Sequence, residues 1–344
     1  MDSKRFGVGL GAVTGSRWDD LAARSADVGR DPVAALRLAA DGGTDVPLPG
    51  GGATAERWAA LATLSAADLS LARAWEPHLD ALAILAEADQ REFAQPGSTW
   101  GVFAAEGPRV RVTAEERDGR WRLHGTKPWC SLAGDLSHAL ITAWVDAEQR
   151  GLFAIDLRDE GVQGGVEEWV PHGLRNIRST SVTLDGVPAR PVGEPGWYLR
   201  RDGFAWGGIG VAAVWFGGAV GVIRRMQQQA AARPLDQIGE LHLGRADVAL
   251  SCARALLAES ADRIDAGRAD GEAGAVLALQ VRHAVHETAE AVLREADHAM
   301  GPAPLAQEAA YADRVADLRL YLRQHHAERD VAALGRSVAA RRPW

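Results

Sequence analysis

The chain has 344 residues, a formal net charge of −8 and 47% hydrophobic residues. This length predicts two or three domains, and the acidic balance argues against non-specific nucleic-acid binding. The sequence contains no uninterrupted apolar run of about 18 residues, which is the length that would predict a membrane span. The two cysteines, Cys130 and Cys252, form no metal or disulfide pattern, and the N-terminal residues 1–6 contain no apolar signal segment. We therefore expect a cytoplasmic protein.

Residues 1–92 are predicted to be helical. Helical spacing of apolar residues covers 18–25, 32–40 and 55–88. The glycine- and proline-rich segment 47–52 between the second and third of these is predicted to be a loop. The third helix is expected to break at Trp75-Glu76-Pro77, because proline removes a helical hydrogen bond.

Residues 93–198 have the pattern of β-structure. Residues 109–114 and 121–125 alternate polar and apolar side chains around Asp118-Gly119, a two-residue hairpin signal. The stretch 92–145, which also contains the short apolar segment 101–105, is predicted to be an antiparallel meander. Further strands are expected at 139–145, 151–156 and 181–187. Glycine and proline cluster between the strands, as an antiparallel barrel or sandwich requires.

Residues 199–344 are rich in alanine, leucine, glutamate and arginine at helical spacing. Four long helices are predicted, at 204–231, 237–266, 272–300 and 306–340. Glycine and proline mark the two later breaks between them. The chain is thus expected to be an α+β protein, mostly helical, with one β-region in its middle.

The segment Gly125-x-Lys127-x-Trp129-Cys130-Ser131 follows the predicted hairpin. It resembles the Gly-x-Lys-x-Trp-Ile-Thr/Ser motif in the middle domain of the acyl-CoA dehydrogenase family. The order helix, β-region, helix is also that of the family, so the resemblance covers nearly the whole chain. It implies a shortened N-terminal helical domain at 1–92, an antiparallel β-barrel or sandwich at 93–198, and a C-terminal four-helix bundle at 199–344.

The resemblance implies a bound flavin, FAD or alternatively FMN. It assigns Trp129 to packing beside the flavin ring and Ser131 to hydrogen-bonding it, although a buried strand aromatic is the alternative for Trp129. Cys130 between them either tunes the flavin's surroundings or is simply a small strand residue. Glu106 stands where the family has a longer glycine-rich cofactor loop. Arg233 stands where a family arginine meets the FAD diphosphate, often from a neighbouring subunit.

Family members place a catalytic glutamate at one of two positions, and this chain has Val211 and His325 there. His325 or His326 is therefore the predicted base, since imidazole titrates near pH 6.5. In a monooxygenase of the same fold, such a histidine would instead protonate or stabilise a flavin peroxide. A solvated helix face, with contacts such as His326 to Asp330, is the non-functional alternative. His78 is a candidate substrate-binding residue, because the family buries that region near its substrate cavity.

His283 and His286 are three residues apart on a predicted helix, near Glu287 and Glu290. The four residues imitate a metal cluster, but no further ligand set of recognised spacing accompanies them. No metal is expected.

These observations favour a flavin-dependent oxidoreductase of the acyl-CoA dehydrogenase type. It would act on an acyl thioester or related small molecule, with FAD as hydride acceptor. A flavin monooxygenase that uses reduced flavin and oxygen is one alternative, and a non-catalytic partner subunit of an active paralogue is another. The family implies a homodimer or homotetramer. The acidic charge and the lack of a long apolar run predict no nucleic-acid or membrane partner.

Overall fold

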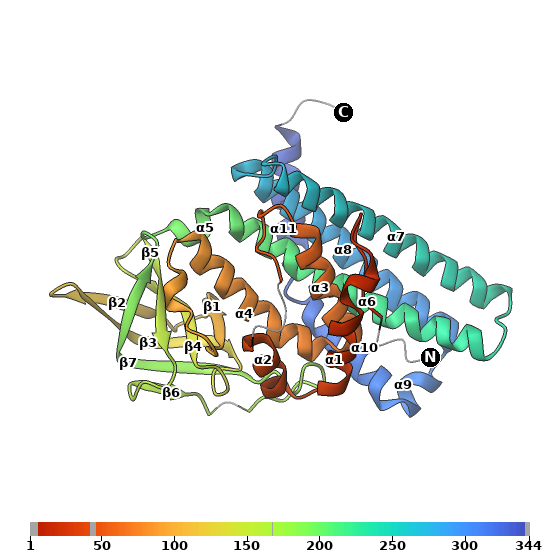
Figure 1. The fold of residues 1–344 in the computed structure, drawn as a ribbon, viewed down its shortest axis with the longest axis horizontal. Coiled ribbons are helices and arrows are strands. Elements are labelled where there is room, and N and C mark those ends of the chain that lie inside the picture. The colour runs from red at the N-terminus through yellow and green to blue at the C-terminus, as the bar shows by residue number, and fades with distance from the viewer. Residues whose placement is uncertain (1–5, 42–45, 167, 341–344) are drawn as a thin grey trace.

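The computed structural model describes residues 6–41, 46–166 and 168–340, so most of the N-terminal segment from which the location was predicted lies outside it. The strands gather at one end of the molecule and the long helices α6, α7 and α8 lie side by side at the other (Figure 1). Helices α3 and α4 lie between these two parts.

The N-terminal region is helical, as predicted. Its elements are η2 (Gly15–Trp18), α1 (Asp19–Val28), α2 (Pro32–Ala40), α3 (Thr54–Ala67), α4 (Leu69–Glu87) and η3 (Arg91–Phe93). The predicted break at Trp75-Glu76-Pro77 is wrong, because α4 runs through Pro77. The chain breaks instead at Asp68, which has an extended backbone (φ −158°) and whose side chain accepts a hydrogen bond from the Ser70 amide. This cap starts a new helix, and the buried apolar face of α4 offsets the cost of the proline.

The middle region contains the strands β1 (Trp100–Phe103), β2 (Val112–Arg117), β3 (Arg120–Ser131), β4 (His138–Trp144), β5 (Arg150–Asp156), β6 (Val162–Gly164) and β7 (Ser179–Val192). The hairpin turn between β2 and β3 lies at Asp118-Gly119, as predicted, with positive φ at both residues. The strand order is β1-β4-β2-β3-β7-β5, and a further β4–β5 pairing closes the sheet into a barrel.

The predicted antiparallel meander is wrong in its order, because β4 lies between β1 and β2 and runs parallel to both. The five central residues of β4 are all buried, which suits an inner strand rather than an edge. The alternation at 109–111 does not form a strand. Arg109 has a positive φ of 65° in the turn before β2, so this strand begins only at Val112.

The C-terminal region is helical. Its elements are α5 (Trp197–Arg200), α6 (Asp202–Ala232), α7 (Gln237–Asp265), α8 (Gly271–Met300), α9 (Ala303–Gln307), α10 (Ala309–Leu322) and α11 (Glu328–Ala339). Three long helices match the prediction, but the fourth is divided into shorter ones. Ala327 has a φ of 44° and cannot continue a helix, and the His326 amide before it donates to the Asp330 side chain (3.3 Å) in the first turn of α11. The turn between α10 and α11 contains His325 and His326.

Helix α6 organises the core between the two helical regions. By length and composition it could cross a membrane, but 78% of its most apolar window is buried within the protein. A Cβ at Gly217 would lie 2.2 Å from the Ala62 carbonyl oxygen, so glycine is needed where α3 crosses α6. This close packing places α3 and α4 against the C-terminal bundle.

Asp317 on α10 ties the three regions together. Its buried carboxylate accepts hydrogen bonds from the Leu174 amide (2.5 Å) of the β-domain and from Arg30 (2.7 Å) of the N-terminal region. Burial raises the pKa of Asp317, while these two hydrogen bonds act in the opposite direction. These contacts of Asp317 hold α10 against the barrel. They also hold the turn after α10, which carries the two histidines.

Candidate functional site

Trp129 stands on a bulge of the barrel wall. The pairing of β3 with β7 shifts its register between Lys127 and Cys130. Trp129 has a φ of 60°, uncommon for a bulky residue, and exposes 63% of its surface. The alternative of a buried strand aromatic is therefore wrong. A strained backbone that presents a large aromatic face outward fits a flat aromatic ligand such as a flavin ring.

The next two residues are less exposed than Trp129, and the second of them connects the strand to α4. Cys130 is fully buried, as expected of a small strand residue. The hydroxyl of Ser131 lies 2.6 Å from the Ser179 hydroxyl and accepts a hydrogen bond from Arg73 (3.2 Å). Ser131 thus links Arg73 of α4 to the strand that carries Trp129.

Glu106 has partners within the barrel. Its carboxylate accepts from Lys127 Nζ (2.8 Å) and from the Trp144 indole (3.3 Å), and Arg150 lies 3.2 Å away. Lys127 is 1% exposed and also donates to the Thr142 hydroxyl (2.8 Å). Burial lowers the pKa of Lys127. Burial acts to raise the pKa of Glu106, but the hydrogen bond and charge of Lys127 hold it below its ordinary value. The lysine of the motif is therefore a buried structural cation, and Glu106 is its counter-ion.

A carboxylate that the sequence did not single out lies behind Ser131. Glu76 on α4 accepts hydrogen bonds from Arg73 (3.2 Å) and from the Tyr321 hydroxyl of α10 (3.3 Å). The Arg73 guanidinium lies 5.4 Å from the centre of the Tyr321 ring. We call Arg73, Glu76, Ser131 and Tyr321 the Glu76 cluster. Burial raises the pKa of Glu76, while the charge of Arg73 lowers it in part.

One signal in the sequence could have identified this carboxylate. Arg73, Glu76, Asp80 and Glu87 recur at helical spacing along one face of the otherwise apolar helix α4. The far end of this face contacts α6, where Arg201 pairs with Glu87 (2.7 Å). A row of charges on a helix with twelve buried residues indicates a polar interior rather than a solvated surface.

Three histidines from two segments, α8 and the turn after α10, meet near that turn. His325 is 5% exposed, and its ring centre lies 4.7 Å from that of His286 and 5.6 Å from that of His283. Its Nδ1 lies 3.3 Å from an Asp330 oxygen. Burial, then the nearby positive charges of His286 and Arg282, lower the pKa of His325 to about 4. The imidazole is therefore neutral at neutral pH.

The two neighbouring histidines differ in exposure, and the alternative of a solvated helix face holds for only one of them. His326 exposes 71% of its side chain and lies 3.4 Å from Asp330, as that alternative predicts. It is wrong for His325, which turns inward because α10 ends three residues before it.

We expect the protein to lose stability on acidification. A histidine whose folded pKa is about 4 binds fewer protons than in the unfolded chain, where it titrates near 6.5, so stability falls as the pH falls between those values. His325 should contribute a loss of about 2 kcal/mol between pH 7 and pH 5. Urea unfolding at both pH values measures the loss. His325→Gln should reduce it by that amount, whereas the same substitution of exposed His326 should not.

Trp215 on α6 joins the Glu76 cluster to the histidines. Its ring centre lies 6.3 Å from that of Tyr321 and 6.1 Å from that of His325. The Arg282 guanidinium lies 4.8 Å from the centre of the Trp215 ring. Within the described part of the chain, the buried indole N–H of Trp215 finds no hydrogen-bond acceptor. An unpaired buried donor is rare, and it marks a place where a ligand or water can bind.

Two further predicted residues lie outside these clusters. His78 is 2% exposed beneath β1, its Nδ1 accepts from the Trp100 amide (3.3 Å), and burial lowers its pKa to about 4. This is a structural contact, and a substrate role stays a prediction. Arg233 is exposed at the end of α6, so it is free to meet a group outside its own subunit.

No metal centre forms among the described residues. His283 and His286 instead contribute to the histidine cluster, and Nδ1 of His286 lies 3.1 Å from a Glu287 oxygen. The expectation of a metal-free site stays a prediction.

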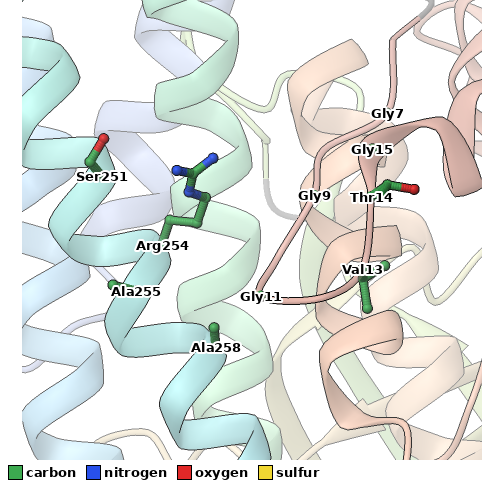
Figure 2. Close-up of a pocket in the computed structure, with 10 residues that line it drawn as sticks. All are labelled: Gly7, Gly9, Gly11, Val13, Thr14, Gly15, Ser251, Arg254, Ala255 and Ala258. Atoms are coloured by element: carbon green, nitrogen blue, oxygen red, sulfur yellow. The ribbon is translucent and has the colours of Figure 1, made fainter.

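A separate pocket of about 590 Å³ lies between α7 and the N-terminal hairpin, which is formed by residues 7–15 with an antiparallel bridge between Leu10 and Val13. Figure 2 shows its glycines on the hairpin side and Arg254 on the helix side. A Cβ at Gly7 would lie 2.0 Å from the Gly15 carbonyl oxygen, so the glycines allow the two arms of the hairpin to pack closely. Their presence is explained by this packing.

Comparisons with known proteins agree with the architecture. No protein-family model matches the chain. The chain is 31% identical over 83 residues to a Bacillus subtilis protein named "Putative acyl-CoA dehydrogenase YdbM", a match that spans 24% of this chain and 21% of that protein.

Solved structures match over much more of the chain. Butyryl-CoA dehydrogenase from Megasphaera elsdenii is 17% identical, with 90% of this chain and 89% of that one covered and a TM-score of 0.75. Dibenzothiophene monooxygenase from Paenibacillus sp. A11-2 is 19% identical (93% and 98% covered, TM-score 0.72), and nitrososynthase from Micromonospora carbonacea is 21% identical (92% and 92%, 0.73).

The chain folds as a β-barrel between two helical regions, and the compared structures share this architecture. The resemblance to the acyl-CoA dehydrogenase family is confirmed, and the chain has the acyl-CoA dehydrogenase fold. Dehydrogenases and monooxygenases both occur among the structures that share it.

Proposed function

We propose that this protein is a flavin-dependent oxidoreductase of the acyl-CoA dehydrogenase type, with the flavin ring against Trp129 and Ser131. The observation that carries the proposal is the exposed face of Trp129, held at a strained φ of 60°. FAD is the proposed cofactor and FMN the alternative, since dibenzothiophene monooxygenase has been solved with FMN. A bound flavin supplies the two-electron acceptor.

The substrate is proposed to be an acyl thioester or a related small molecule with a polar group. Arg73 and Tyr321 offer hydrogen-bond donors at the inner side of Ser131, suited to a carbonyl oxygen. His325 is proposed to handle a proton, and its neutral ring suits hydrogen bonding better than holding a charge. His326 lies at the solvent side and is proposed to exchange protons with water.

A flavin monooxygenase is the second candidate. It is favoured by the residues at the family's two glutamate positions, because Val211 has no acid–base group and His325 is buried among other imidazoles. One of the compared structures, the dibenzothiophene monooxygenase, supports the same candidate.

The visible absorption spectrum of the purified protein tests these readings. After addition of FAD or FMN, we expect flavin bands that bleach on anaerobic photoreduction. Reoxidation by air without a peroxide-like intermediate would favour the dehydrogenase, whereas such an intermediate would favour the monooxygenase. A protein that stays colourless with either flavin would be the non-catalytic partner subunit instead.

A homodimer or homotetramer is also proposed. Ile238, Leu241 and Val248 are exposed and lie along one stripe of α7, at spacings of three and seven residues. Such a stripe suits packing against a helix of a second copy. Sedimentation equilibrium tests this, with a monomer mass for wild type as the contrary result. A cytoplasmic location stays a prediction.

A further inference from the structure

The family's two glutamate positions converge on one place in this structure. Val211 lies one helical turn before Trp215, and His325 lies one turn after Tyr321. The rings of Trp215 and Tyr321 are in contact, with centres 6.3 Å apart. Helix α6, which carries Val211, and helix α10, which ends just before His325, therefore meet at the Trp215–Tyr321 pair.

A carboxylate is present at that place, but it comes from the N-terminal region. Glu76 accepts the hydrogen bond of the Tyr321 hydroxyl, and through Arg73 it is connected to Ser131, two residues beyond Trp129. Its side chain remains 13% accessible, so it is enclosed by protein but not sealed from small molecules. No other described carboxylate forms a hydrogen bond with Tyr321 or Arg73.

Resting on the proposed function, we propose that Glu76 is the acid–base carboxylate of the site, supplied by α4 instead of the C-terminal bundle. Its carboxylate takes the proton from the C–H bond beside the substrate carbonyl. A bound oxidised flavin would accept the hydride of the neighbouring C–H bond, and the electron pair left by the proton would form the new double bond. Glu76 would then hold the proton, and the substrate would leave as the unsaturated product.

The surroundings of Glu76 suit a carboxyl group that is protonated and deprotonated in turn. Burial and the nearby Asp80 favour the protonated form, whereas Arg73, Arg57 and the Tyr321 hydroxyl favour the carboxylate. Arg282 of α8 adds another positive charge within electrostatic range. Burial is the largest of these influences and holds the pKa of Glu76 above its ordinary value, which suits a group that both takes up and gives up a proton.

A purely structural role makes a different prediction. If Glu76 only balances Arg73 and the other arginines, then its removal lowers stability but leaves the reactive edge of the flavin unchanged. Sulfite separates the two cases, since this anion binds the reactive nitrogen of an oxidised flavin and bleaches its visible band. A carboxylate close to that nitrogen repels sulfite, so the affinity reports the charge of Glu76 without any substrate.

The experiment compares sulfite binding by FAD- or FMN-loaded wild type, Glu76→Gln and Glu87→Gln between pH 5.5 and 8.5. Wild type should bind sulfite more weakly as Glu76 loses its proton. Glu76→Gln should bind about tenfold more tightly at high pH and lose this pH dependence. Glu87→Gln, on the same face of α4 but paired with Arg201, is the matched control and should behave like wild type.

Tyr321→Phe provides a second variant that keeps the carboxylate in place. Loss of the hydroxyl donor should move the midpoint of the sulfite dependence to higher pH, because the carboxylate form loses a hydrogen bond. An unchanged sulfite affinity in Glu76→Gln and an unchanged midpoint in Tyr321→Phe would overturn the assignment of Glu76 alone. Failure of the wild type to bind either flavin would overturn the proposed function as well.

Discussion

Replacement of Trp129 by alanine is expected to weaken flavin binding about 30- to 100-fold. A stacked indole that becomes covered by a ligand contributes about 2–3 kcal/mol, and each 1.4 kcal/mol corresponds to a factor of ten in affinity. The substitution should leave the fold intact, because the side chain is 63% exposed and contributes little to the core. Titration with FMN and with FAD, followed by flavin fluorescence, measures both dissociation constants.

Trp129→Phe is the matched control for this prediction. Phenylalanine keeps a flat face at the same bulge, so its affinity should stay within about fivefold of wild type, a change near 1 kcal/mol. Thermal unfolding of both variants should remain close to wild type. Equal affinities of the alanine variant and wild type would show that the indole does not stack on the flavin, and the proposed binding site would then be wrong.

The sequence could predict the part of the site that is local. Trp129 and Ser131 lie within one motif, and the hairpin before it has a turn whose conformation Asp118-Gly119 dictates. The order of helical and β-regions follows from periodicity in the same way. These features depend on residues that are neighbours in the chain, so their pattern is visible without the fold.

The Glu76 cluster could not be predicted in this way. Glu76 and Tyr321 are 245 residues apart, and their contact depends on the packing of α4 against α10. The inward turn of His325 depends on the end of α10, although apolar and polar residues continue at helical spacing through it. The position of β4 between β1 and β2 is likewise a tertiary feature, because alternation predicts strands but not their order.

The second large effect is expected at the ion pair inside the barrel. Glu106→Ala removes the counter-ion of Lys127, whose side chain is 2% exposed, and should lower the free energy of unfolding by about 3–5 kcal/mol. Lys127→Met should cost less than about 1 kcal/mol. In this variant Glu106, which is 34% exposed, keeps Arg150 and the Trp144 indole as partners, so no charge is left isolated.

A double-mutant cycle in urea tests this asymmetry. In the Lys127→Met background, Glu106→Ala should cost less than about 1 kcal/mol, because no buried ammonium remains to be neutralised. The cost of Glu106→Ala alone should fall as the pH rises, since burial already lowers the pKa of Lys127 and the stranded amine can lose its proton. Equal costs in both backgrounds would mean that Glu106 acts independently of Lys127. That result would instead favour the cofactor-binding role that the family resemblance implies for Glu106.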